Sequence, residues 1–200
     1  MNPEHALTTP ETTTTPEAEK QPENTPAIYI ACLAAYNNGR LHGEWIDATI
    51  GAEEIHQHIQ TMLASSPEPG AEEWAIHDYD NFGPLRLGEH ADIDYVASVA
   101  EHIQAHGAPF AAWLDFTGFE QDKWHYFTDA YLGEYENLNT YITQLIEDLG
   151  YDELLNQHLP KSMRAYLAID KELMARDLEA GGDIFTIETG NSVHIFDSRI

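Results

Sequence analysis

The pattern of apolar and polar residues predicts a small antiparallel sheet with one helix at the start of the folded chain. Residues 27–36 alternate apolar side chains as a strand does, and an Asn-Asn-Gly turn leads back into a second strand over residues 41–46. Residues 53–64 carry Ile, Met and Leu at helical spacing. The segment EEWAIHDYD reads as a third strand, so we predict an N-terminal α+β domain over residues 27–87.

The spacing becomes helical in the middle of the chain. Asp92 or Asp94 is placed to cap a helix of regularly spaced Val and Ile residues, which Gly107 closes. A short helix over residues 109–116 follows. We predict a central helical domain over residues 88–119.

The last part of the chain combines helices with a β-hairpin. Helical spacing predicts helices over residues 120–132, 139–149, 152–158 and 171–178. Two short apolar runs around a Thr-Gly-Asn-Ser turn predict a hairpin over residues 184–196. We predict a C-terminal α+β domain over residues 120–200, and α+β as the class of the whole chain.

Residues 1–26 differ from the rest, because they are rich in Thr, Pro and Glu and poor in apolar residues. Such a segment buries too little surface to offset its chain entropy, so we expect a disordered tail. Cys32 is the single cysteine, which excludes an internal disulfide and favours a reducing compartment. No apolar run suits a membrane span or a signal peptide, and we expect a cytoplasmic protein that does not bind membranes.

The charge is strongly one-sided. The 200 residues include 35 Asp and Glu against nine Lys and Arg, for a formal charge of −26. From residue 41 to residue 160 there are 23 acidic residues, and the basic ones are Arg86 and Lys123. Most of these carboxylates cannot form internal ion pairs, so they face water or a partner. Nucleic acid is excluded as that partner, because it is bound by the cations this chain lacks.

An acidic surface can serve solubility alone, and composition does not decide between that role and binding. Aromatic residues are abundant enough for real cores. Trp45, Trp74, Trp113 and Trp124 fall one to a predicted element, and we expect them to fill those cores.

The spacing of residues gives little support for a metal site or a catalytic site. His102 and His106 are four residues apart, on one face of a predicted helix, but no HExxH motif or cysteine pair adds the ligands that zinc requires. We interpret them as surface histidines and expect no metal or cofactor. His77, Asp78 and Asp80 are accompanied by no GxSxG motif and no phosphate-binding glycine loop, so we predict a protein that is not an enzyme.

Carboxylates between inward-facing apolar positions remain as candidates for function. Duplex DNA carries one negative charge per about 1.7 Å, so a charge of −26 matches roughly 44 Å of duplex, or about 13 base pairs. A rigid polyanion of this kind can compete for cations arranged to bind phosphates. The candidate phosphate-mimicking residues are Asp92, Asp94, Glu101, Asp115, Glu120, Asp122, Asp129, Glu134, Glu136, Glu147 and Asp148.

Four segments carry a resemblance to a known family. They are AIYIACLAAYNNGRLHGEWIDA, EEWAIHDYDNFGPLRLGEH, DAYLGEYENLNTYITQLIEDLG and LPKSMRAYLAIDKELMARDLEAGGDIF. The chain resembles the ArdA-type antirestriction proteins over residues 27–197. These proteins are carried on plasmids and conjugative transposons.

The resemblance implies an elongated chain of three small domains that forms a homodimer and mimics bent B-form DNA. It implies that the partner is a type I restriction-modification enzyme, bound at its methyltransferase core of specificity and modification subunits. The family's antirestriction motif corresponds to residues 150–170 and is associated with the dimer contact. The motif residues expected there are Gly150, Leu154, Leu155, Leu159, Pro160, Met163, Tyr166, Ile169 and Asp170.

Two other functions remain open from the sequence. An acidic, chaperone-like module would shield a basic nucleoid protein, and it predicts tight binding to histone-like proteins. A metal-dependent hydrolase using His102 and His106 would require stoichiometric metal. The resemblance favours the antirestriction inhibitor over both.

Overall fold

A computed structural model describes residues 24–164 and 166–200. Most of the predicted tail, residues 1–23, lies outside the described residues. Within its last residues, the Thr25 carbonyl accepts a hydrogen bond from the Asn81 side chain at 2.9 Å and the Pro26 carbonyl accepts one from Ala48 N at 2.9 Å. The chain is therefore attached to the first sheet two residues before its first strand begins.

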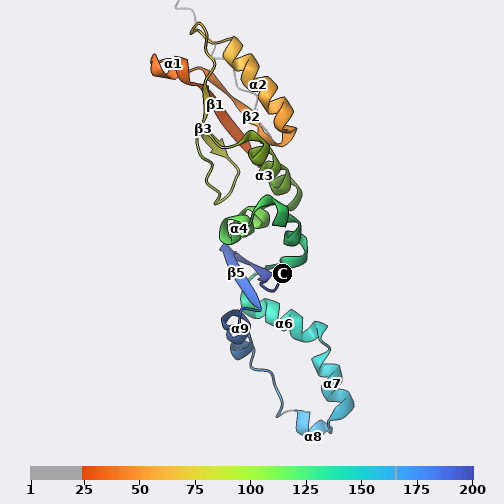
Figure 1. Cartoon of the computed structure of the whole chain (residues 1–200). Coiled ribbons are helices and arrows are strands. Elements are labelled where there is room, and N and C mark those ends of the chain that lie inside the picture. The colour runs from red at the N-terminus through yellow and green to blue at the C-terminus, as the bar shows by residue number, and fades with distance from the viewer. Residues whose placement is uncertain (1–23, 165) are drawn as a thin grey trace, which may run out of the picture.

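The molecule is elongated, with the first sheet and α2 at one end, α4 and β5 in the middle, and α7 and α8 at the other end (Figure 1). The elements of the first half are β1 (Ala27–Cys32), α1 (Leu33–Asn37), β2 (Gly43–Asp47), η1 (Ala48–Ile50), α2 (Ala52–Ala64), β3 (Trp74–Asp80), α3 (Ile93–His106) and α4 (Ala108–Thr117). Those of the second half are η2 (Gln121–Tyr126), α5 (Phe127–Ala130), β4 (Tyr131–Tyr135), α6 (Leu138–Asp148), α7 (Tyr151–His158), α8 (Lys161–Arg164), α9 (Lys171–Ala180), β5 (Ile184–Thr189) and β6 (Ser192–Asp197).

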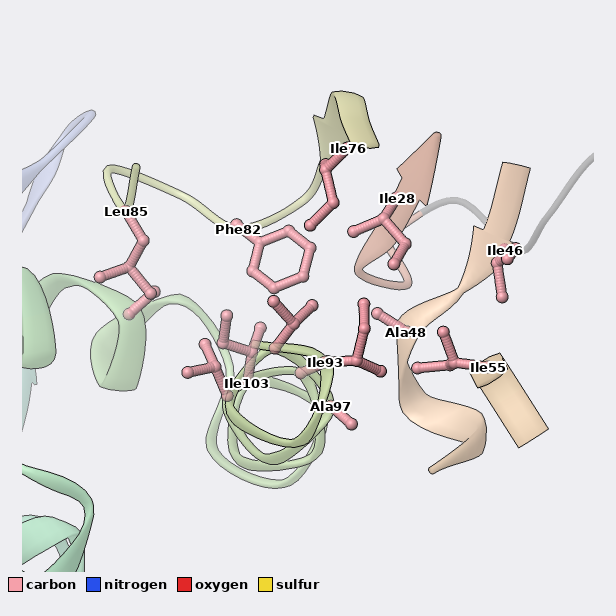
Figure 2. Close-up of a cluster of buried hydrophobic side chains, with 14 of the residues drawn as sticks. Ile28, Ile46, Ala48, Ile55, Ile76, Phe82, Leu85, Ile93, Ala97 and Ile103 are labelled. Atoms are coloured by element: carbon pink, nitrogen blue, oxygen red, sulfur yellow. The ribbon is translucent and has the colours of Figure 1, made fainter. Parts of the chain in front are cut away.

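The first sheet is antiparallel with the order β2-β1-β3, as predicted. Strand alternation sends Ile28, Ile46 and Ile76 to one face, where each is at most 3% exposed. Ile55 of α2 and Ile93 of α3 pack against them (Figure 2). Two helices therefore cover one face of this sheet, and on the other face Trp45 is 44% exposed while the small side chains of Ala27 and Ala31 are each 4% exposed.

The predicted first strand is too long. It ends at Cys32, and residues 33–37 form α1, because the alternation of apolar residues stops there and Leu-Ala-Ala is a helix-favouring sequence. The turn after α1 leads into β2 as expected.

The apolar core continues from the first sheet to the last strand. An aromatic cluster bridges the middle of the molecule: the Phe110 ring lies 6.0 Å from Trp113, 5.6 Å from Trp124 and 5.4 Å from Phe127, and Phe127 lies 6.2 Å from Phe196. The division at residues 87 and 119 stays a prediction, and packing is continuous across both positions.

The predicted helix over residues 120–132 is confirmed over residues 121–130, as η2 and α5, but its last two residues belong to a strand. Helical turns end at Ala130, and residues 131–135 form β4, which pairs with β6 in a second antiparallel sheet of order β4-β6-β5. Gly133 has φ of +127°, which no helix accommodates. The predicted hairpin of β5 and β6 is confirmed, and β4 extends it to three strands.

The central strand of the second sheet contains a buried histidine. His194 of β6 is 3% exposed, and its Nδ1 shares a hydrogen bond with the Tyr131 hydroxyl at 3.0 Å. Burial lowers the pKa of His194, although the Glu134 carboxylate opposes that shift. The neutral imidazole thus ties β6 to β4 inside the sheet.

Gly43 gives a test of the first sheet. A Cβ at this position would lie 2.3 Å from the Ile30 carbonyl oxygen and 2.9 Å from the Tyr29 hydroxyl. We expect Gly43→Ala to lower the free energy of unfolding in urea by about 1–3 kcal/mol, since backbone must move to admit a methyl group. Gly88→Ala is the control, because a Cβ there meets nothing within 4 Å. Equal stability of the two variants would contradict this packing.

Candidate partner-binding surface

The predicted phosphate-mimicking carboxylates are all exposed and follow the long axis of the molecule. They are carried by consecutive elements from α3 through α4, η2, α5 and β4 to α6 (Figure 1). Every one is classed as exposed: Asp92, Asp94, Glu101, Asp115, Glu120, Asp122, Asp129, Glu134, Glu136, Glu147 and Asp148. The fold therefore distributes these charges from α3 to α6, between the first sheet and α7 (Figure 1).

None of these eleven carboxylates forms an ion pair with another described residue. The ion pairs of the described chain use other acids, such as Glu68 with Arg40 at 3.0 Å and Asp197 with Arg199 at 2.6 Å. Lys123 lies over the Phe119 ring at 5.3 Å. The negative charge from α3 to α6 is consequently uncompensated within the part of the chain that the structure describes.

The backbone under these carboxylates is fixed by buried neighbours. Asp92 caps α3, since its Oδ1 accepts hydrogen bonds from Asp94 N at 2.8 Å and Tyr95 N at 3.3 Å. Ile93, between the two acids, is 3% exposed. Exposed acids alternate with core residues in this way along α3 and α4, so the core sets where the charges lie.

The pKa values of two tyrosines are affected by neighbouring carboxylates. Burial, and next the Glu120 carboxylate, raises the pKa of Tyr95. Burial, and next the Glu134 carboxylate, raises the pKa of Tyr131. By contrast, a hydrogen bond from Arg199 lowers the pKa of Asp197. Both tyrosines stay neutral beside the acidic surface.

His106 of α3 is exposed, as predicted, whereas His102 packs against the core. His102 and His106 share one helix face as predicted, with ring centroids 6.1 Å apart. His102 stacks on Phe110 at 5.0 Å, and its Nδ1 lies 2.8 Å from the Ser98 carbonyl, so it is a half-buried core residue and not the surface histidine expected. No group of three or more His, Cys, Asp or Glu that could hold a metal occurs among residues 24–164 and 166–200.

The predicted motif over residues 150–170 forms an arm with little internal burial. Neither α7 nor α8 contains a buried residue, and Leu154, Met163 and Tyr166 are 52%, 51% and 82% exposed. The other motif residues are Gly150, Leu155, Leu159 and Ile169, which are half-buried, and Pro160 and Asp170, which are exposed.

Polar contacts fix the shape of this arm. Arg164 Nε donates to the Leu159 carbonyl at 3.0 Å and its Nη2 donates to the Asn156 carbonyl at 2.9 Å, joining α8 to α7. Asp170 caps α9 by accepting from Leu173 N at 3.0 Å. Arg164 therefore holds α8 against α7 at the far end of the molecule (Figure 1).

Trp45 does not fill a core, contrary to the prediction. Trp113 and Trp124 are buried as expected, at 1% and 2% exposure, but Trp45 is 44% exposed. Its neighbour Ile46 is buried, so alternation along β2 sends Trp45 to the opposite, open face. That alternation was the signal that would have identified it.

Comparison with known proteins identifies a family. The family model described as "Antirestriction protein (ArdA)" matches residues 28–193. No curated protein matches the chain. No helix of the described residues is long and apolar enough to span a membrane.

Substitutions at the end of α6 test whether its acidic residues are positioned to stabilise the fold. Glu147 and Asp148 lie in its last turn, where negative charge opposes the helix dipole. We expect Glu147→Gln with Asp148→Asn to raise the free energy of unfolding by about 0.3–1 kcal/mol per charge. The matched control removes Asp152 and Glu153 from the first turn of α7, where stability should fall. A loss of stability in the first variant would contradict this assignment.

Proposed function

The chain belongs to the ArdA family of antirestriction proteins, and from this premise we propose that it inhibits restriction-modification enzymes as a mimic of DNA. Membership gives the antirestriction function and the class of partner. The proposal adds the mechanism: exposed carboxylates stand in for DNA phosphates and occupy the DNA-binding groove of a type I enzyme, at its core of specificity and modification subunits.

The observation that supports the mechanism is the uncompensated row of eleven carboxylates from α3 to α6. A DNA-binding groove already contains Lys and Arg arranged to neutralise a polyanion. A rigid protein polyanion can meet those cations without any base-edge contact, because phosphate contacts position a duplex but carry no sequence information. Inhibition is therefore general with respect to the recognition sequence.

The elongated shape suits the same role (Figure 1). Carboxylates spread along consecutive elements reach cations spread along a groove, which a compact acidic domain would not. The inhibitor acts in the cytoplasm, where restriction enzymes meet incoming DNA.

We further propose that two copies associate through the arm of α7 and α8. The exposed Leu154, Met163 and Tyr166 leave apolar surface without a partner in one chain, and a second copy would cover it. Association at this end would place two acidic bodies in one extended assembly and lengthen the mimic.

Neutralising a block of acids tests the mechanism. We expect the variant Glu101→Gln, Asp115→Asn, Glu120→Gln and Asp122→Asn to bind a type I methyltransferase core roughly tenfold to a thousandfold more weakly than the unaltered chain, since four exposed ion pairs are lost. Dissociation constants are measured by fluorescence anisotropy of labelled inhibitor at one fixed salt concentration.

The control variant removes the same charge elsewhere, with Glu53→Gln, Glu54→Gln, Glu72→Gln and Glu73→Gln. These residues are also exposed but lie on α2 and before β3, away from the row. The affinity of this control variant for the methyltransferase core should fall clearly less than that of the first variant. Equal losses in the two variants would show that net charge alone matters and would contradict binding through the row.

The proposed dimer contact is tested by Leu154→Ser with Met163→Ser. Both side chains are about half exposed, so the chain should remain folded while the apolar contact is lost. We expect sedimentation velocity to show a dimer for the unaltered chain and a monomer for the variant. Leu41→Ser, at the other end of the molecule and 87% exposed, should leave the dimer intact. A monomeric unaltered chain would overturn the proposal.

A further inference from the structure

The open face of the first sheet carries aromatic rings and carboxylates in register. Across the three strands, Trp45 pairs with Tyr29, and Tyr29 pairs with Asp78. In the next row, Asp47 pairs with Ala27, and Ala27 pairs with Asp80. Paired residues of a sheet share a face, so these side chains lie on the side that α2 and α3 do not cover.

The aromatic rings form a fixed surface on this face. The Tyr29 and Trp45 ring centroids are 5.6 Å apart. The Tyr29 hydroxyl lies over Gly43, whose missing side chain leaves room for it. Trp45 is nevertheless 44% exposed, so part of a large indole ring faces solvent without a partner in the described chain.

The carboxylates beside the rings have no cation. Asp78 and Asp80 are exposed, and each Oδ1 accepts only from the following backbone N–H, at 2.9 Å in both cases. Asp47 is occupied by Thr49, whose N and Oγ1 donate to it at 2.8 and 2.7 Å. No Lys or Arg occurs in the three strands. The face therefore combines a π surface with unneutralised negative charge.

We infer that this face binds arginine side chains of the target's DNA-binding groove, with guanidinium groups stacking on the rings of Trp45 and Tyr29 and donating to Asp78 or Asp80. Guanidinium is planar, stacks on aromatic rings and donates to carboxylates, so arginine satisfies both features. The inference rests on the proposed function and adds to it, because stacking is a contact that phosphates alone do not make.

Other occupants fit this face less well. An apolar partner surface would bury Asp78 and Asp80 without counter-charges, which costs free energy. A second copy of the same face would bring like charges together. An ammonium group of lysine would meet the carboxylates but would not stack on the ring as a plane.

The test compares dissociation constants for a type I methyltransferase core, measured by anisotropy with labelled full-length inhibitor. Trp45→Leu keeps apolar volume but removes the indole, and we expect it to weaken binding about tenfold. Asp78→Asn with Asp80→Asn should weaken binding several-fold, whereas the control Glu53→Gln with Glu54→Gln, on the helix-covered side, should change it less. Trp45→Phe retains a ring and should lie between the unaltered chain and Trp45→Leu.

A second readout isolates Trp45 by comparing the unaltered chain with Trp45→Leu, because the chain contains four tryptophans. Acrylamide quenching of tryptophan emission should fall when the enzyme binds the unaltered chain, and this protection should be absent in Trp45→Leu. An unchanged dissociation constant for Trp45→Leu, beside ordinary binding by the unaltered chain, would overturn the inference alone. Absence of binding by the unaltered chain would overturn the proposed function as well. If Trp45→Leu lost self-association but kept enzyme binding, the face would be a contact with a second copy, and the inference would be overturned.

Discussion

The whole structure depends on holding many like charges in fixed positions on one chain. A formal charge of −26 on 200 residues produces repulsion that the fold must offset. Two features do so. An apolar core continues from Ile28 to Phe196, and the elements follow one another along an elongated body. Because screening at physiological salt acts over about 8 Å, spreading the carboxylates along that body weakens their mutual repulsion.

Each part of the molecule supports one exposed surface or contributes to it. The aromatic cluster of Phe110, Trp124 and Phe127 fixes the middle, where Asp115, Glu120, Asp122 and Asp129 are exposed. The second sheet closes the core behind β4 and carries Glu134 outward. The arm of α7 and α8 contributes apolar surface that the single chain leaves uncovered. The core residues and the exposed carboxylates thus lie on different sides of the same elements.

Most of the fold could be predicted from the sequence, because periodicity fixes the faces of isolated helices and strands. The first sheet, α2, α3, α4, α6 and the final hairpin all followed from local patterns. β4 did not, since its partner β6 lies some sixty residues away and local spacing around Trp124 and Phe127 is helical. The exposure of the acids could be predicted from the scarcity of cations. The exposure of Trp45 was missed because residue type was weighed above strand alternation.

Under the proposed mechanism, the inhibitor and DNA occupy the same groove. The most direct measurement is the apparent dissociation constant of the inhibitor for a type I methyltransferase core at increasing concentrations of a duplex that contains the recognition site. Competition for one groove predicts that the apparent constant rises in proportion to the duplex concentration, with no ternary complex. An apparent constant that levels off, or a complex containing enzyme, duplex and inhibitor together, would contradict the account.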